Sequence, residues 1–333
     1  MHSLPRNVRF WSLAISLIAA VALTSCTKAP ATPPVSNTEG ASQTQSASES
    51  RFAVFSPALG EMLQGLGFED SIVGKHSFDL ALSDSIPVMG SHIEIDYELL
   101  ITLEPTDLFF EQNTTEIPER VRTLASANGW QIWTYRLNTL DDIAGAVDDL
   151  YLKLVGFPEK TIDDTNFMNP DLDPTSRFEI ELPSARLARA WSPIGRDAAG
   201  ARRVLLLASV DPPGAMGPGS FHAQLLDRLG ITPAIDDGAQ WQELDYEDII
   251  ALAPDSIIVF MPRALDADDL IGEPIPMDWA TISAKLGGIA RLPIPAAENH
   301  QIAIIDDPLG LLPSTSLARV ADEIRAAIEG WKP

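Results

Sequence analysis

The sequence predicts an α/β protein of two lobes, each built on a mostly parallel sheet, with a cleft between the lobes. Two observations predict this class. Short apolar segments alternate with segments of helical period through most of the chain, as in doubly wound sheets. In addition, one segment of the first half recurs 149 residues later, in the second half. A repeat at that spacing indicates two lobes of the same layout.

The first lobe is expected at residues 51–138. Its first helix begins where Ser56, a favoured N-cap, precedes Pro57, because proline suits the first helical position. Gly67 ends this helix. The strands are expected at 52–55, 71–74, 106–110 and 131–135, and the helices at 57–66, 96–103, 116–128 and 139–155.

The second lobe, expected at residues 201–333, repeats the alternation. A loop rich in glycine and proline follows its first strand and precedes a helix that Gly230 ends. The strands are expected at 203–208, 256–260 and 301–305, and the helices at 221–229, 245–252 and 314–330.

The internal repeat joins residues 95–105 to residues 244–254. Both copies have an Asp at the helix N-cap, a Glu in the first turn, an apolar stripe, and a Pro before the next strand. Chance similarity between two α/β helices would explain the stripe and the proline. The shared Asp-Tyr-Glu triplet, at 96–98 and 245–247, is better explained by two related lobes.

The two lobes are joined by a predicted linker at residues 139–200. Proline disfavours helix at the residue before it, so a helix in this region is interrupted. At most a broken helix, over roughly residues 175–191, is expected to cross between the lobes. The prolines of the linker are Pro158, Pro170, Pro174, Pro183 and Pro193.

Residues 1–25 are predicted to be a lipoprotein signal peptide. A basic start precedes a short apolar stretch, then small residues, then Cys26. The segment from Leu23 to Cys26 resembles a bacterial lipobox, in which Cys26 becomes the lipidated first residue. An ordinary secretory signal followed by a chance cysteine is the alternative. Cys26 is the only cysteine in the chain, so a disulfide within one copy is excluded.

Residues 26–50 are predicted to be the lipidated cysteine followed by a disordered tether. Pro, Ser, Thr, Gln and Ala dominate this segment, which has almost nothing to pack. The expected location is therefore outside the cytoplasm, in the periplasm or at the cell surface, with a lipid anchor as the sole attachment to a membrane. No second apolar segment is long enough to span a bilayer.

The charge and the motifs exclude several functions. Removing the signal peptide leaves 21 basic and 47 acidic residues, a net charge of −26. That excess of acid argues against nucleic-acid binding and against adhesion to anionic lipid. The sequence also lacks a Gly-x-Ser-x-Gly elbow, a His-Glu-x-x-His motif and a phosphate loop. We therefore expect a protein that is not an enzyme.

A distributed pattern of motifs covers nearly all of residues 51–330. In the first half it comprises Phe55-Ser56-Pro57, Glu61-Met62-Leu63, Leu66-Gly67, Ile72-Val73-Gly74, Pro87 to Gly90, Glu98 to Leu103 and Pro105-Thr106-Asp107. In the second half it comprises Val204 to Leu207, Gly217 to Phe221, Leu225-Leu226, Leu229-Gly230 and Glu247 to Pro254. This pattern resembles the class III periplasmic binding proteins, which serve ABC importers of vitamin B12, iron-siderophore chelates and haem.

The resemblance implies two Rossmann-like lobes and a monomeric substrate-binding lipoprotein with no cofactor. Such a protein captures a cobalamin, ferric-siderophore or haem-type ligand in the inter-lobe cleft and delivers it to an ABC permease dimer. A ligand-sensing or scaffold lipoprotein of the same fold, with no transporter, is the alternative. The family has one long rigid helix between its lobes, whereas residues 156–200 predict an interrupted one. The resemblance therefore leaves the rigidity of the link open.

In that family, a surface glutamate of each lobe docks onto arginines of the permease. The matching positions are Glu98 and Glu247, which the internal repeat also pairs. Two exposed carboxylates can hold two guanidinium groups through charge-assisted hydrogen bonds. The alternative is that both merely complement a helix N-terminus. The two roles are compatible.

The ligand-binding residues are expected in loops, because ligands of open α/β sheets bind beyond the carboxyl ends of the strands. Two helices begin in these loops, and their amide ends would favour an anionic group. Residues 214–219 are rich in glycine, which lets backbone approach a bulky ligand or simply forms a turn. The candidates are Ser56, Pro57, His76, Phe78, His92, Ser220, Phe221, His222 and Trp241.

The histidines show no paired spacing of the kind that captures a bare metal ion, so no direct metal site is expected. A single axial ligand to haem iron or corrinoid cobalt needs only one side chain, and His76 or His222 could supply it. Each histidine can equally be a plain polar residue. Phe78, Phe221 and Trp241 would offer apolar faces to a flat macrocycle, or they are core aromatics.

Overall fold

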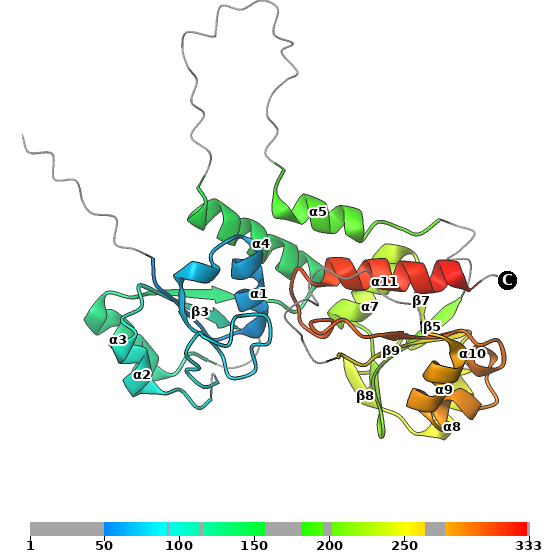
Figure 1. Ribbon diagram of the computed structural model, residues 1–333. Coiled ribbons are helices and arrows are strands. Elements are labelled where there is room, and N and C mark those ends of the chain that lie inside the picture. The colour runs from blue at the N-terminus through cyan, green and yellow to red at the C-terminus, as the bar shows by residue number, and fades with distance from the viewer. Residues whose placement is uncertain are drawn as a thin grey trace, which may run out of the picture. The chain divides into compact units, whose positions relative to one another are not determined.

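The structure, a computed structural model, describes residues 50–91, 93–112, 116–156, 181–195, 202–263 and 277–331 (Figure 1). Several expectations lie outside these residues. They are the signal peptide, Cys26, almost all of the tether, His92, and the linker prolines at 158, 170 and 174.

The N-terminal sheet has four strands in the order β2-β1-β3-β4, and all of its pairs are parallel. The strands are β1 (Phe52–Val54), β2 (Ile72–Gly74), β3 (Asp107–Glu111) and β4 (Gln131–Tyr135). Because every strand runs in the same direction, all four carboxyl ends lie along one edge of the sheet. A 3₁₀ turn, η1 (Glu69–Ser71), leads into β2.

Helices cover both faces of this sheet. Successive side chains of a strand point to opposite faces, and here the side chains on both faces are apolar. On one face, Phe52, Val54 and Phe109 pack with α1 (Pro57–Gly65) and α4 (Leu140–Leu154). On the other face, alternate side chains of β1 and β3 pack with α2 (Tyr97–Thr102) and α3 (Glu119–Asn128). Strands buried on both faces explain the continuous apolar runs of the sequence.

The C-terminal sheet has the order β10-β9-β5-β6-β8. Its parallel part is β5 (Arg203–Val210), β9 (Ser256–Phe260) and β10 (Ile302–Ile305), and β7 (Thr232–Pro233) also pairs with β5. Two further strands, β6 (Pro213–Met216) and β8 (Trp241–Glu243), are antiparallel to their neighbours. The sequence predicted a loop where β6 lies, because Pro213-Gly214-Ala215-Met216 has no β-branched or aromatic residue to signal a strand.

Helices also cover both faces of the second sheet. One face packs with α7 (Phe221–Leu229) and α11 (Leu317–Gly330). The other packs with α8 (Tyr246–Leu252), α9 (Trp279–Leu286), the 3₁₀ turn η3 (Ile289–Arg291) and α10 (Pro295–Glu298). The last helix begins at Leu317, three residues later than predicted. The hydroxyls of Ser314 and Ser316 bond to each other, at 2.8 Å, in a turn before it.

The described end of the linker is the helix α5 (Pro183–Ala190), which packs against both α4 and α11. It begins at Pro183. Proline is tolerated at the first helical position, because the backbone N–H that proline lacks would have no hydrogen-bond partner within the helix there. Glu181 and Leu182 are not helical, so the predicted helix over 175–191 is shorter in the described residues. The Trp191 indole donates a hydrogen bond to the Leu317 carbonyl at 3.3 Å. The linker thus contacts elements of both lobes.

A buried carboxylate joins the first helix of one sheet to the last helix of the other. Glu61 of α1 accepts hydrogen bonds from the Thr315 hydroxyl, at 2.7 and 2.8 Å to its two oxygens, and from the Thr315 amide at 3.2 Å. Burial raises the pKa of Glu61, and the bonds from Thr315 partly oppose this. Since a buried charge is costly without partners, Thr315 stabilises the whole arrangement.

None of the helices in the described ranges combines the length and the apolar character needed to cross a bilayer.

We predict that Thr315→Val destabilises the protein by about 1–3 kcal/mol, because the Glu61 carboxylate loses its hydroxyl partner while it stays buried. Thr123→Val is the matched control. The Thr123 hydroxyl also donates a hydrogen bond, at 3.0 Å to the Glu119 carbonyl, but it lies on an exposed helix face. Urea unfolding at neutral pH measures the free energy of unfolding of the two variants. Equal effects of the two variants would contradict the proposed role of Thr315.

Candidate functional site

Ser56 lies at the carboxyl edge of the N-terminal sheet, directly after β1. Its hydroxyl accepts a hydrogen bond from the Leu59 amide at 3.3 Å, as the N-cap of α1, and donates to Glu111 Oε2 at 2.9 Å. Glu111 is the last residue of β3. Pro57 follows at the first helical position and is half-buried. The Ser56 hydroxyl therefore fixes the edge where two strands end, and the helix N-terminus beside it has its amides aimed outward.

The loop after β2 lies along the same edge and presents an aromatic ring. The buried Lys75 ammonium donates to the Leu82 carbonyl at 2.9 Å, which holds the loop closed. His76 is buried, and its Nδ1 accepts a hydrogen bond from the Phe78 amide at 3.1 Å. The Phe78 side chain is 74% exposed, with its ring 5.6 Å from that of His76. The loop thus offers an apolar face above a buried imidazole.

Asp79 supports this loop from below. Its Oδ1 accepts hydrogen bonds from the amides of Ala81 and Leu82, both at 3.0 Å, whereas its buried Oδ2 has no partner among the described residues. Burial raises the pKa of Asp79 to about 6, against the lowering effect of the two amides and Lys75. No motif of the sequence predicted this buried acid, which follows Phe78 in a loop.

The carboxyl edge of the C-terminal sheet forms a cavity of about 470 Å³, a size typical of small-molecule sites. Cations and anions both line it, and the Arg263 guanidinium donates to Asp306 Oδ1 at 2.9 Å. The lining residues are Ala208, Ser209, Val210, Asp211, Phe260, Met261, Pro262, Arg263, Lys285 and Asp306. This edge combines an apolar floor with charges that could orient a ligand.

None of these lining residues was among the sequence candidates. Arg263 follows the predicted strand 256–260, and Asp306 follows the predicted strand 301–305. The rule that ligands bind beyond the carboxyl ends of strands applies equally to these two ends. The signal was therefore present in the sequence.

The sequence candidates of the second lobe lie at the start of α7 and on β8. Strand β6 turns back along β5, so that Ala215 is opposite Leu207 and Met216 is opposite Trp241. Met216 lies three residues back from the hairpin, about 10 Å from the carboxyl end of β5. Residues 217–220 then lead into α7, whose second residue, His222, contacts Phe260 at the carboxyl end of β9 with ring centroids 4.6 Å apart. Ser220 is the N-cap of this helix, and its hydroxyl accepts from the Ala223 amide at 3.1 Å.

Two aromatic candidates of this region remain accessible. Trp241 is 51% exposed on β8, at the end of the sheet, and Phe221 is half-buried at the start of α7. A bridge from Gln240 Nε2 to the Gly219 carbonyl, at 3.0 Å, ties the two segments together. The structure therefore brings Ser220, Phe221 and Trp241 into one region, and the start of α7 lies beside Phe260 at the carboxyl end of β9.

The expectation that His222 could be an axial metal ligand is wrong for this structure. The side chain is 1% exposed, and its ring lies 4.3 Å from that of Phe221 and 4.6 Å from that of Phe260. Its Nε2 donates to the Gly310 carbonyl at 2.8 Å, while Nδ1 has no hydrogen-bond partner in the described chain. Burial lowers the pKa of His222 to about 4. The imidazole is therefore a neutral core residue.

The sequence contained a signal for this burial. His222 precedes Leu225, Leu226 and Leu229 at spacings of three, four and seven residues, which places all four on one helix face. That face packs against the sheet. Of the two histidines expected as axial ligands, only His76 follows a carboxyl strand end.

We predict that His222 makes stability depend on pH between about 6.5 and about 4. The unfolded imidazole takes up a proton as the pH falls through 6.5, whereas the folded one stays neutral down to about 4. Stability is therefore lost as the pH falls through this window, by up to about 3 kcal/mol. Urea unfolding measures the free energy of unfolding of His222→Gln and of the parent chain across this pH window. The variant should lack the loss of stability that the parent chain shows.

The control for this prediction is His300→Gln. His300 is exposed and stacks on Trp279, with ring centroids 4.2 Å apart. This variant should keep the pH dependence of the parent chain. A His222→Gln profile parallel to that of the parent would contradict the buried neutral imidazole.

The two expected docking glutamates occupy equivalent places on α2 and α8. Each lies in the first turn, and both side chains are exposed. Neighbouring aspartates cap these helices. Asp96 accepts hydrogen bonds from the amides of Glu98 and Leu99, and Asp245 accepts a hydrogen bond from the amide of Asp248. Within the described residues, neither the Glu98 nor the Glu247 carboxylate has a hydrogen bond or an ion pair.

An exposed isoleucine accompanies each glutamate. Ile101 lies three residues after Glu98 and is 44% exposed, and Ile250 lies three residues after Glu247 and is 39% exposed. Residues three apart share a helix face. Each lobe therefore presents an exposed carboxylate beside an exposed apolar side chain, in the same arrangement.

No protein-family description matches the chain, and no curated protein matches it. Solved structures do match. The periplasmic haem-binding protein RhuT from Roseiflexus sp. RS-1 has a TM-score of 0.58 at 18% identity, over 85% of this chain and 99% of that protein. The periplasmic haem-binding protein HutB of Vibrio cholerae has a TM-score of 0.57 at 18% identity, over 86% of this chain and 100% of that protein.

A third match is the periplasmic vitamin B12-binding protein BtuF of Vibrio cholerae. Its TM-score is 0.52 at 15% identity, over 84% of this chain and 97% of that protein. These three matches are binding proteins and not enzymes. They confirm the predicted class of two α/β lobes with mostly parallel sheets. The chain has the fold of the class III periplasmic binding proteins.

Proposed function

We propose that the protein is the substrate-binding lipoprotein of an ABC importer. It is exported, anchored through a lipid on Cys26, and captures a cobalamin, ferric-siderophore or haem-type ligand for delivery to a permease dimer. The strongest support is the likeness to haem- and vitamin B12-binding proteins over at least 97% of their lengths. Because proteins of one fold can bind different ligands, we expect the side chains of the two carboxyl edges to determine which ligand binds.

The ligand site in this proposal lies between the carboxyl edges of the two sheets. The edge of the first lobe offers the exposed Phe78 ring, on which a flat macrocycle or an aromatic chelate can stack. The edge of the second lobe offers Arg263 and Lys285 within its cavity. Guanidinium and ammonium groups bind carboxylates well, so an anionic substituent of the ligand would be held there.

Delivery in this proposal depends on Glu98 and Glu247. Both carboxylates are exposed and unpaired in the described chain, and an exposed isoleucine accompanies each. A partner surface that carries two arginines beside apolar side chains would complement this arrangement. Since Asp96 and Asp245 already cap the helices, the glutamates are available for a partner.

We predict that haem, cobalamin or a ferric siderophore raises the melting temperature of the soluble body, residues 51–333, in a saturable way. Binding to the native state alone stabilises it, by about 2.7 kcal/mol at a ligand concentration of one hundred times Kd. Phe78→Ala should lower the affinity for that ligand about tenfold, because one stacking face is lost. Val155→Ala, another exposed apolar position, is the control. No shift with any of the three ligand classes would contradict the proposed ligand class.

We predict that Glu98→Lys combined with Glu247→Lys abolishes ligand-stimulated transport in vesicles that contain the permease, while ligand affinity is unchanged. The reversed charges would face the arginines of the permease. The matched control is Glu119→Lys with Glu298→Lys, because these exposed glutamates also lie in first helical turns, of α3 and α10. Equal transport by the two double variants would indicate that Glu98 and Glu247 serve only their helices, or that the protein has no transporter.

A further inference from the structure

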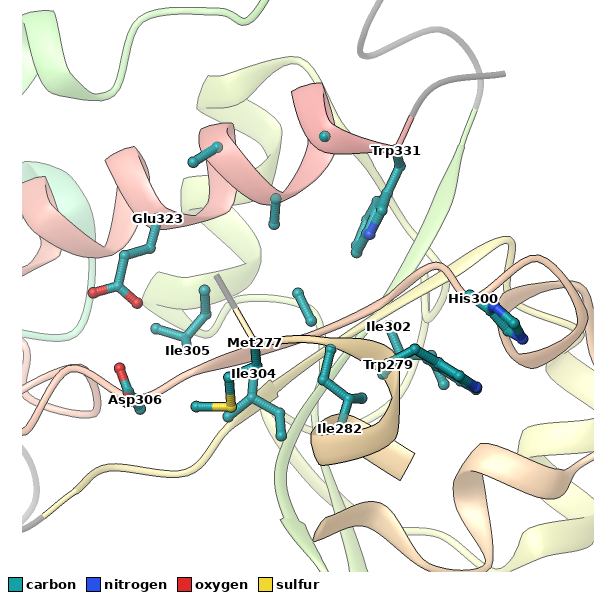
Figure 2. A pocket seen from close by; sticks show the side chains of 14 residues that line it. Met277, Trp279, Ile282, His300, Ile302, Ile304, Ile305, Asp306, Glu323 and Trp331 are labelled. Atoms are coloured by element: carbon teal, nitrogen blue, oxygen red, sulfur yellow. The ribbon is translucent and has the colours of Figure 1, made fainter. Parts of the chain in front are cut away.

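A second cavity lies along the outer edge of the C-terminal sheet, between α9 and α11 (Figure 2). Strand β10 is the last strand of the sheet on this side and forms the floor. The volume is about 360 Å³, within the range of small-molecule sites. The lining residues are Met277, Trp279, Ile282, His300, Ile302, Ala303, Ile304, Ile305, Asp306, Glu323, Ala326, Ala327, Gly330 and Trp331.

One end of this groove is aromatic. The rings of Trp279 and His300 stack at 4.2 Å with an angle of 17° between their planes. Trp331, at the end of α11, lies across the groove from them (Figure 2). Between these rings and the other end the walls are aliphatic, formed by residues such as Ile282 and Met277. An apolar or aromatic group would be removed from water here.

The other end of the groove is acidic, with one more carboxylate than guanidinium group among the described residues. Three carboxylates gather there with two guanidinium groups. Asp306 pairs with Arg263 at 2.9 Å, and Asp307 pairs with Arg319 at 2.8 Å. The third carboxylate, Glu323, has neither a hydrogen bond nor an ion pair within the described ranges, and it lies opposite Asp306 (Figure 2).

The environment of Glu323 shows the same excess of negative charge. Burial, and then the charges of Asp307 and Asp306, raise the pKa of Glu323 to about 7, although Arg263 and Arg319 act in the opposite direction. A cation at this end would therefore meet an unsatisfied carboxylate, whereas an anion would be repelled.

The distance between the two ends sets the shape of a ligand. Glu323 and Trp331 are eight residues apart on α11, which corresponds to about 12 Å along the helix axis. We propose that this groove binds an elongated organic cation, with its ammonium group at Glu323 and Asp306 and its apolar or aromatic body between α9 and α11. The site does not depend on the proposed transport function. It adjoins the carboxyl-edge cavity only at Asp306.

The test uses three probes of one shape and different charge, titrated against the soluble body by calorimetry: 4-phenylbutylammonium, 4-phenylbutanol and 4-phenylbutyrate. The ammonium compound should bind saturably and about tenfold more tightly than the alcohol, and the carboxylate should bind most weakly. That factor corresponds to about 1.4 kcal/mol. Equal affinity for the ammonium compound and the alcohol, or no saturable binding of the ammonium compound, would overturn the proposal.

A pair of variants on α11 locates the cation. Glu323→Gln should reduce the affinity for 4-phenylbutylammonium to that for the alcohol, while Glu329→Gln, at an exposed position of the same helix, should leave it unchanged. An unchanged preference for the ammonium compound in Glu323→Gln would place the cation elsewhere and overturn the assignment. Binding of haem, cobalamin or a siderophore should be the same in both variants, so the result is independent of the transport hypothesis.

Discussion

The contact between Glu61 and Thr315 joins the two halves of the molecule. Glu61 lies in the second turn of α1, the helix that starts at the carboxyl edge of the first sheet, and Thr315 lies between the carboxyl end of β10 and α11. A carboxylate buried at this junction would be costly without the hydroxyl and the amide that hold it. One threonine therefore connects the chain segments that leave the carboxyl edges of both sheets.

Other contacts extend the same junction. Arg228 of α7 pairs with Asp141 of α4, and the Leu140 amide donates to Gln224 at 3.2 Å. Within the described residues, the part of the linker after α4 is the short helix α5, in contact with α4 and α11. The first apolar core runs continuously through α1, α4, α5, α7 and α11, so the junction belongs to the core and not to a flexible hinge.

The fold was predictable from the sequence wherever a strand was apolar and a helix was capped. Phe109 and Ile258 lie in runs buried on both faces, and Ser56, Asp96 and Asp245 each precede a helix that the structure contains. The short antiparallel strands were not predictable, because β6 has no β-branched or aromatic residue and gains its partners through tertiary pairing.

The site was predictable only in part. The rule of carboxyl strand ends led to Ser56, His76 and Phe78, and the same rule, applied to the ends of β9 and β10, leads to Arg263 and Asp306. What the sequence conceals is pairing across the sheet, because the hairpin that precedes Ser220 depends on the pairing of β6 with β5. The acidic groove at β10 likewise depends on Glu323 meeting Asp306, seventeen residues earlier in the chain.

In the proposed function, the two carboxyl edges together form the ligand site. Hydrogen–deuterium exchange, with and without the ligand that stabilises the protein, measures which segments the ligand protects. We expect protection to concentrate in the segments after β1, β2, β5, β9 and β10, around Ser56, Phe78, Asp211, Arg263 and Asp306. Protection of one edge alone, or of segments such as α2 and α3 with both edges unchanged, would contradict a site shared by the two lobes.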